Sequence, residues 1–360
     1  MYVLVLPVSG GGFVSQLAIL QHLCEIHFIP DLTLASSGGN VAAYIAAASN
    51  WKWPGIERIA RELSKDFFIQ PWNGIAPLSM IVGYFQGALY NKGSGVLEFL
   101  SNYFTPESIT KYEIWTGTYN KYRQKALLFC NRDSKDSIID SSCIDHDLTQ
   151  SMEPVFANGN IELISDAAVA SASIPAIVPA QKIMGEDYTD GGVAGASPLS
   201  IMQEPILKYI KDHNDSLHIV YVNSVNLSNP HTKPGHNVID TWRQATRNMV
   251  RSQTVIDRIS GYELLRCYPG IMHKEELVCT YENLERIKKI QSRIKYSMLE
   301  ICPIDNFDVE ITKFTGEDVI NAIHTAYKNC ICRLWWLSPI DDAPDPEVSS
   351  LLDECKSSIE

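Results

Sequence analysis

Residues 32–47 read LTLASSGGNVAAYIAA, and this stretch decides the fold because an apolar run passes directly into serine and glycine. The run Leu32 to Ser36 predicts a strand buried on both faces, whereas Asn40 to Ala48 is rich in alanine and predicts a helix. A strand that turns into a helix within a few residues is typical of an α/β sheet. The stretch therefore predicts a strand, a tight turn and a helix.

The turn places Ser37 between small residues, with Ala35 two positions before it and Gly39 two positions after it. Acyl-transfer enzymes use this arrangement because the turn around the nucleophile is strained and leaves no room for neighbouring side chains. The pattern is the G-x-S-x-G elbow with alanine in place of the first glycine. In such an elbow the next backbone N–H, here that of Gly38, points at the developing oxyanion. Ser-Gly-Gly is also common as a structural turn or helix N-cap, so the motif alone leaves both interpretations open.

A second glycine loop lies near the start of the chain. Tyr2 to Val8 predicts another buried strand, Gly10-Gly11-Gly12 follows it, and a helical pattern covers Gln16 to Cys24. Consecutive glycines before a helix expose backbone N–H groups that favour an anionic oxygen. A phosphate loop would require a lysine, and a dinucleotide loop a further glycine, where this chain has Val14 and Ser15. An oxyanion hole fits better, with a structural turn as the alternative.

Both loops are expected at the same edge of one sheet. Residues 1–50 contain only two charged side chains, Glu25 and Asp31, so this part predicts the buried centre of an α/β sheet. Ligands of such sheets bind at the carboxyl ends of the strands, where both loops would open.

A serine nucleophile requires a base, and Asp190 is the candidate. It stands in the run Tyr188-Thr189-Asp190-Gly191-Gly192, where the glycines allow close backbone approach. An aspartate at a turn is unremarkable by itself. Upstream, however, Ala170 to Pro175 reads ASASIP.

With these motifs the chain resembles the patatin-like phospholipases, lipid acyl hydrolases that use a Ser–Asp dyad. Four segments are similar in the same order over roughly residues 1–205: Ser9 to Gly12, LTLASSGGNVAAYIAA, AAVASASIPAIVPAQKI and Asp190-Gly191-Gly192. The resemblance implies a three-layer α/β/α fold with a mostly parallel central sheet.

The resemblance also assigns roles to residues. Ser37 would be the nucleophile and Asp190 the base, and the oxyanion would be held by main-chain donors of Gly10, Gly11, Gly12 and Gly38. Gly39, Gly191 and Gly192 would support the two turns. The substrates would be fatty acyl esters of phospholipids or lysophospholipids, cleaved through an acyl-enzyme with no metal and no cofactor. An aspartate is a weak base at neutral pH, so its use would depend on close placement or desolvation.

Three departures from the family pattern keep a second interpretation open. Phe13-Val14-Ser15 stands where the family has Arg or Lys, Ala35 replaces the elbow glycine, and no Asn precedes Pro198. The alternative is a catalytically weakened lipid-binding or scaffold protein. A Ser-His-Asp triad is a further possibility because six histidines follow Asp190: His213, His218, His231, His236, His273 and His324.

Charge and cysteine content limit the partners and the compartment. The net charge of −12 argues against nucleic-acid binding, since no wide basic face would neutralise phosphates. Nine cysteines without a CxxC pair indicate reduced, buried thiols and a cytoplasmic protein. The first 24 residues lack a basic region and are interrupted by Pro7 and glycines, so we expect neither a signal peptide nor a spanning helix, and a soluble protein.

The chain is expected to form one acyl hydrolase domain, residues 1–340, with a helical C-terminal part at 236–340 and a solvated acidic tail at 341–360. The uncharged segment 67–91 predicts either core, an acyl-chain channel or a membrane contact. Basic helices are expected at 237–260 and 284–298, and peripheral contact with anionic lipid is possible there. Their cations are Arg243, Arg247, Arg251, Arg286, Lys288, Lys289, Arg293 and Lys295.

Overall fold

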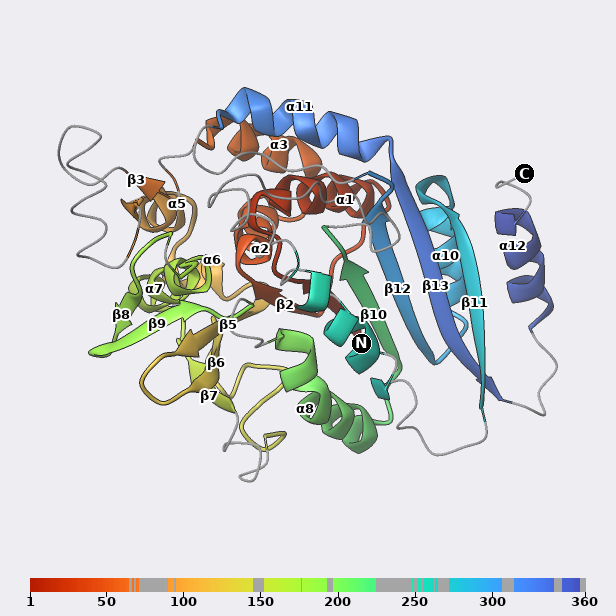
Figure 1. Ribbon diagram of the computed structural model, residues 1–360. Coiled ribbons are helices and arrows are strands. Elements are labelled where there is room, and N and C mark those ends of the chain that lie inside the picture. Colours follow the sequence, from red (N-terminus) through yellow and green to blue (C-terminus); the bar gives the residue numbers. More distant parts are fainter. Residues whose placement is uncertain are drawn as a thin grey trace.

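The computed structural model describes residues 1–64, 67, 69–70, 88, 90–93, 95–144, 152–175, 177–192, 197–224, 248, 251–253, 255–261, 263–264, 272–305, 314–339 and 345–356. A large mixed sheet forms its centre, in the order β11-β13-β12-β10-β1-β2-β5-β6-β7, with β9 paired to β5 and β8 to β9. The five central strands, from β12 to β5, run parallel (Figure 1). The predicted α/β fold with a mostly parallel central sheet is confirmed.

The strands are β1 (Tyr2–Leu6), β2 (Leu32–Ser36), β3 (Ile69–Gln70), β4 (Asn91–Lys92), β5 (Glu113–Asn120), β6 (Lys125–Cys130), β7 (Met152–Phe156), β8 (Gln181–Ile183), β9 (Glu186–Asp190), β10 (Leu217–Val222), β11 (Met272–Thr280), β12 (Tyr296–Pro303) and β13 (Cys330–Pro339). Strands β1, β2 and β10 are almost wholly buried, as their continuous apolar runs predict. The expected strand at 32–36 coincides with β2.

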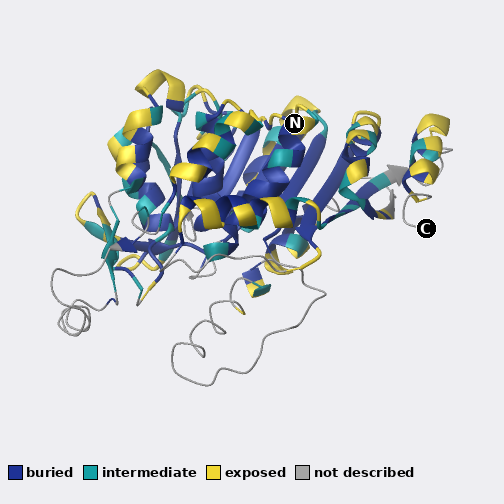
Figure 2. Ribbon diagram, turned by 90° about the horizontal axis from the view of Figure 1, so that it is seen from above, coloured by how far each residue is buried: buried dark blue, intermediate teal, exposed yellow. Residues whose placement is uncertain are grey.

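The α-helices are α1 (Phe13–Glu25), α2 (Gly38–Ala48), α3 (Trp53–Glu62), α5 (Gly95–Tyr103), α6 (Pro106–Ile109), α7 (Ile161–Ser171), α8 (Pro198–His213), α10 (Leu284–Gln291), α11 (Gly316–Tyr327) and α12 (Pro346–Lys356). Two short 3-10 turns, η1 (Gly10–Gly12) and η4 (Tyr281–Asn283), precede α1 and α10. Helices α1, α2, α3 and α11 share one hydrophobic core, and α8 lies in a second core. The sheet separates the two cores, and the outer sides of the helices are exposed (Figure 2).

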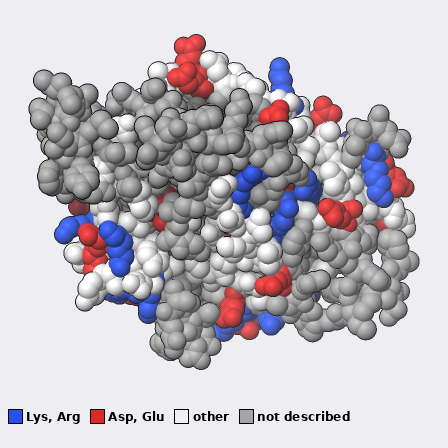
Figure 3. Space-filling model, in the orientation of Figure 1, with Lys and Arg blue, Asp and Glu red and all other residues white. Residues whose placement is uncertain are grey.

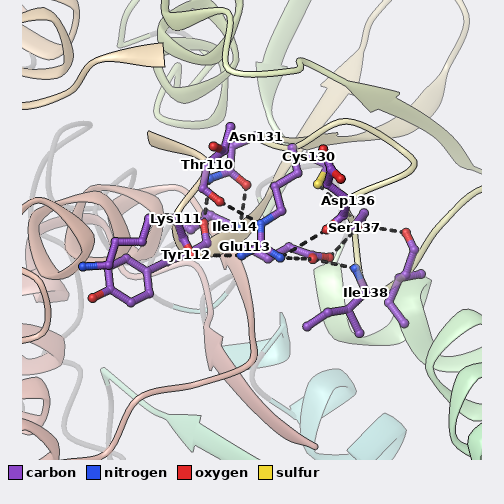
Figure 4. A network of polar contacts seen from close by, with 12 residues as sticks. Thr110, Lys111, Tyr112, Glu113, Ile114, Cys130, Asn131, Asp136, Ser137 and Ile138 are labelled. Carbon is purple, nitrogen blue, oxygen red and sulfur yellow. Dashed lines mark hydrogen bonds and ion pairs between the residues drawn. The ribbon is translucent and has the colours of Figure 1, made fainter. Parts of the chain in front are cut away.

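A buried polar network fixes the amino end of β5 (Figure 4). Glu113 accepts hydrogen bonds from the Ser137 hydroxyl at 2.7 Å and the Ile138 N–H at 2.7 Å, and it pairs with Arg132 at 3.2 Å. The side chain of Asn131 donates to the carbonyl oxygens of Ile109 and Tyr112. This network lies at the opposite end of β5 from the carboxyl edge of the sheet, so it sets the position of the strand rather than contributing to a site there.

The C-terminal part differs from its expected helical character. The helix expected over 284–298 ends at Gln291, and β12 starts at Tyr296. Three strands, β11, β12 and β13, lie in the part expected to be helical, together with α10 and α11. Apolar spacing over short runs does not distinguish a buried strand from a helix, which explains the error. In the expected helix at 237–260, the described residues 251–253 and 255–260 are helical, and the remainder lies almost entirely outside the described residues.

The acidic tail is not the solvated segment that its composition indicates. Residues 346–356 form α12, which buries Val348, Leu352 and Cys355 against the core shared with α10 and β11. Its apolar residues recur at helical spacing and face the core, whereas most of its acidic residues face outward. The predicted solvated tail was wrong because the prediction rested on the acidic residues and not on the helical spacing of the apolar ones.

Candidate active site

The two glycine-containing loops open at the same edge of the sheet. Strands β1 and β2 are parallel and adjacent, and each runs at its carboxyl end into one of the loops (Figure 1). Strand β1 has β2 on one side and β10 on the other. The chain therefore leaves β1 in one direction and returns on its other side, which makes this position a topological switch point. Open α/β sheets bind ligands at such a point.

Ser37 has an unusual backbone conformation between β2 and α2. Its φ is 54° and its ψ is −131°, and it precedes Gly38, the first residue of α2. Non-glycine residues avoid this region because Cβ approaches the backbone, at a cost of about 1–3 kcal/mol. The backbone N–H of Ser37 donates to Ser171 Oγ at 2.9 Å, and this hydroxyl donates to the carbonyl oxygen of Gly117 at 2.7 Å. The surrounding structure thus holds a strained serine in place.

The glycines of the elbow have no space for a side chain. A Cβ on Gly38 would lie 2.5 Å from Ser9 Oγ and 2.7 Å from the carbonyl oxygen of Gly10. A Cβ on Gly39 would lie 2.2 Å from the carbonyl oxygen of Leu6. Because these atoms belong to the end of β1 and to the loop after it, the elbow and the glycine loop pack directly against each other.

Asp190 comes to the same place through the pairing of β5. Strand β6 occupies one hydrogen-bonding edge of β5 from Trp115 to Asn120, so β2 and β9 must share the other edge. On that edge Ser36 is opposite Gly117, and Asp190 is opposite the next residue, Thr118. The carboxyl ends of β2 and β9 therefore meet, with Asp190 and the residue before Ser37 at adjacent positions along β5.

The loop after β9 completes the arrangement. Asp190 is fully buried, its Oδ1 accepts the N–H of Gly192 at 2.9 Å, and its own N–H donates to the carbonyl oxygen of Ser173 at 3.0 Å. A Cβ on Gly191 would lie 2.9 Å from the carbonyl oxygen of Gly117, and one on Gly192 would lie 2.5 Å from Val8 Cβ. The Asp-Gly-Gly turn thus passes from β5 to the end of β1. All of the predicted site residues lie at this edge.

Ser171 and Ser173 belong to the ASASIP segment, and the sequence alone predicts no role for either residue. The Ser171 hydroxyl connects the elbow to β5, and the Ser173 carbonyl holds the backbone of Asp190. Both serines lie at or just after the end of α7, close to the elbow and to Asp190. The motif contains these two serines, but the spacing of residues in the sequence does not show which groups they contact.

The missing cation after the glycines has a structural reason. Phe13 is buried and packs edge-on against Phe314, with ring centroids 6.1 Å apart, and Val14 and Ser15 are also buried. The start of α1 is therefore part of the hydrophobic core. A lysine or arginine at position 13 would place an unpaired charge there, which is costly.

The described histidines lie away from Ser37. His218 is buried at the amino end of β10, opposite Tyr2, where its Nδ1 hydrogen-bonds with Ser297 Oγ at 2.9 Å. His213 ends α8, and its ring stacks on Tyr209. His324 is exposed on α11. His231 and His236 lie outside the described residues, as does the side chain of His273. The described histidines therefore give no support to a Ser-His-Asp triad.

A second set of buried charges lies toward the carboxyl ends of β10 and β12. The hydroxyl of Tyr221 donates to Asp257 at 3.1 Å, and Glu300 pairs with Arg258 and accepts from Asn223 at 3.1 Å. Burial raises the pKa of the Asp257 carboxyl from its usual value to about 8, against the opposite effect of the Tyr221 hydrogen bond. No sequence motif pointed to this cluster.

The basic residues of α10 and of the turn that follows it are mostly engaged by the chain itself. Arg286 pairs with Glu354 at 3.0 Å and Arg293 with Asp345 at 3.1 Å, both from the segment that carries α12. The Lys288 ammonium donates to the carbonyl oxygen of Ile26 at 2.7 Å. On the face seen in Figure 3, the described cationic and acidic side chains lie side by side. The acidic segment therefore pairs with two of the cations expected to contact lipid, Arg286 and Arg293.

In the described part of the chain, no helix has both the length and the apolar character needed to cross a bilayer. The described residues also contain no group of three or more His, Cys, Asp or Glu side chains placed to hold a metal ion. Most of the uncharged segment 67–91 lies outside the described residues, so its role stays a prediction.

An α/β sheet whose first two strands end in a glycine loop and a serine elbow, with an aspartate turn beside them, defines a class of protein. Residues 6–202 match the family model of the patatin-like phospholipases. Because this match covers more than half of the chain and contains the whole edge described above, the chain belongs to the patatin-like phospholipase family. No curated protein matches the chain.

Proposed function

We propose that the protein hydrolyses fatty acyl esters of phospholipids or lysophospholipids with Ser37 as nucleophile and Asp190 as base. Asp190 takes the hydroxyl proton while Ser37 Oγ attacks the ester carbonyl carbon. The tetrahedral intermediate collapses to an acyl-enzyme, and the proton passes to the departing alcohol of the lipid. Water, deprotonated by Asp190, then attacks the acyl carbonyl carbon. The bond from this carbon to Ser37 Oγ breaks, the proton passes from Asp190 to that oxygen, and the fatty acid leaves.

The observation that carries this proposal is the strained serine beside a buried carboxylate. Ser37 is held at a φ of 54° by surrounding contacts, and strain of this kind clusters at functional sites. The meeting of β2 and β9 at adjacent positions of β5 supports a direct hydrogen bond between the Ser37 hydroxyl and Asp190 during reaction. Burial of both side chains removes water that would otherwise compete for the carboxylate.

Main-chain N–H groups at the elbow would hold the oxyanion. The first N–H groups of a helix have no intrahelical partner, and Gly38 begins α2. The loop Gly10–Gly12 packs over this residue and would supply further donors without reorganisation. We assign the oxyanion hole to the N–H groups of Gly10, Gly11 and Gly38. The N–H of Gly12, also expected as a donor, is bonded to the Ser9 carbonyl oxygen at 2.9 Å and so holds the loop in shape. Gly39, Gly191 and Gly192 are the residues that allow this packing.

The protein would act in the cytoplasm, in peripheral contact with lipid aggregates or membranes. The eight described cysteines whose state is given are free and buried, which supports a reducing compartment.

A lipid panel tests the proposal. Wild type is expected to release fatty acid from vesicles of diacyl or monoacyl phospholipid, and Ser37→Ala and Asp190→Asn are expected to lose at least about 10³-fold in rate. Ser36→Ala removes the neighbouring buried hydroxyl and is the matched control, expected to retain activity. A fluorophosphonate should add its mass to the peptide that contains Ser37 and to no other. Full activity of Ser37→Ala would overturn the proposal.

The alternative, a lipid-binding or scaffold protein on the same fold, is favoured by one observation. Ser37 is only 2% exposed and Asp190 is fully buried, so the nucleophile lies in a nearly closed site. Vesicle binding by wild type without fatty acid release, together with no fluorophosphonate labelling, would favour this alternative.

A further inference from the structure

Ser9, the residue before the glycine loop, has a buried hydroxyl that the proposed dyad does not use. The residue is 7% exposed, and its Oγ has no hydrogen-bond partner among the described residues. A buried hydroxyl without a partner costs about 1–3 kcal/mol. Such a group in a folded protein requires an explanation.

The usual explanation, capping of a helix, does not apply. Ser9 is the N-cap of η1, but its side chain makes no capping hydrogen bond, and its carbonyl oxygen instead accepts the N–H of Gly12 at 2.9 Å. Ser171, the other buried serine at the elbow, has a hydroxyl that both donates and accepts. The two serines differ in that only Ser9 is left with an unused donor.

The Ser9 hydroxyl is directed at the elbow. Its Oγ lies 2.5 Å from the position that a Cβ on Gly38 would take, so it stands directly over the residue after Ser37. Near the other end of the same loop, Ser224 is 1% exposed and has an Oγ without a partner in the described part of the chain. This Oγ lies 3.5 Å from the Cβ position of Gly12. Two buried hydroxyls without a described partner thus lie next to the glycine loop, that of Ser9 near Gly38 and that of Ser224 near Gly12.

We propose that Ser9 Oγ–H donates a hydrogen bond to the substrate carbonyl oxygen as that oxygen becomes the oxyanion. The inference rests on the proposed acyl hydrolysis and adds a side-chain donor to its main-chain donors. A donor that has no partner before reaction gains one only when the oxygen arrives, so its contribution falls on the transition state. Phe13 is buried and no cation follows the glycines. The side-chain donor that the loop itself can supply is therefore a neutral hydroxyl.

The test compares Ser9→Ala, Ser224→Ala and wild type with a soluble short-chain ester. Ser9→Ala is expected to lower kcat about 10²-fold with KM changed less than about twofold, the effect of removing one oxyanion donor. A trifluoromethyl ketone carrying an acyl chain, which mimics the tetrahedral adduct, should bind Ser9→Ala about 10²-fold more weakly, whereas a free fatty acid should bind both equally. Ser224→Ala, which removes the hydroxyl near Gly12 and not the one near Gly38, should change none of these values more than about threefold.

A merely structural role predicts other results. Removing a hydroxyl that lacks a partner should leave Tm unchanged or raise it, so a Tm of Ser9→Ala lowered by more than about 5 °C would overturn the inference. Equal kcat and equal ketone affinity in Ser9→Ala and wild type would overturn it while leaving acyl hydrolysis intact. Absence of turnover and of fluorophosphonate labelling in wild type would overturn both proposals together.

Discussion

The elbow region, formed by β1, β2, β5 and β9, and the C-terminal region, formed by β10 to β13 with α10 and α12, belong to one sheet but are held in different ways. In the elbow region backbone meets backbone, and glycines such as Gly39 and Gly191 leave the space for it. In the C-terminal region buried side chains pair over long sequence distances, as Asn223 does with Glu300. The difference teaches that a motif marks places where the main chain must approach closely, whereas pairing between side chains leaves no local pattern.

The largest expected effect comes from filling the closest backbone contact of the elbow region. In Gly39→Ala the new Cβ would lie 2.2 Å from the carbonyl oxygen of Leu6, which cannot move without disturbing β1. We expect a loss of about 4 kcal/mol or more in the free energy of unfolding, or no folded protein. Gly185→Ala is the control, because nothing lies within 4 Å of its Cβ position and only its φ of +85° opposes the change. Denaturant unfolding should show about 1 kcal/mol for the control. Similar losses for both variants would contradict the comparison.

The C-terminal region should instead show its character in the pH dependence of stability. The folded pKa of Asp257 is about 8, above its usual value of 3.8, so between these values the folded state binds more protons than the unfolded state. Stability from this group therefore falls as pH rises, by roughly 1.4 kcal/mol per pH unit. Asn does not titrate, so the stability of Asp257→Asn relative to wild type should rise by about 3.5 kcal/mol from pH 5 to pH 8.

Denaturant unfolding at the two pH values measures this change. Asp353→Asn, at an exposed position of α12, is the control and should follow wild type. A constant difference between Asp257→Asn and wild type over this pH range would show that Asp257 is not held as the neutral acid.

The packing of α12 tests whether the C-terminal region contributes to stability without affecting the activity of the elbow region. Leu352→Ala should lower the free energy of unfolding by about 2–3 kcal/mol, because Leu352 is buried against the core. Ser350→Ala, at an exposed position of the same helix, should change it by less than about 0.5 kcal/mol. Esterase activity per folded molecule should be unchanged in both. If Leu352→Ala cost nothing, the segment would be a solvated tail after all.

How much could be predicted from the sequence follows the same division. The strands ending at Leu6 and Ser36, the elbow and the aspartate turn could be predicted, because each combines an apolar run with small residues that only a close approach requires. The strand β12 and the helix α12 could not, since a run of eight to eleven apolar and charged residues is compatible with several structures. The Ser171 bridge and the Asp257 cluster could not be predicted either, because they depend on partners far away in the chain.

The smallest expected effect follows from the backbone of Ser37, whose φ of 54° suits glycine better than any other residue. Ser37→Ala keeps the unfavourable conformation, whereas Ser37→Gly relieves it. The free energy of unfolding of the glycine variant should therefore be about 1 kcal/mol higher than that of the alanine variant. Equilibrium unfolding of the two inactive proteins measures the difference. The proposed nucleophile thus occupies a position at which glycine would make the folded state more stable than serine does. Selection for thermostability alone, without selection for turnover, would be expected to replace Ser37 with glycine.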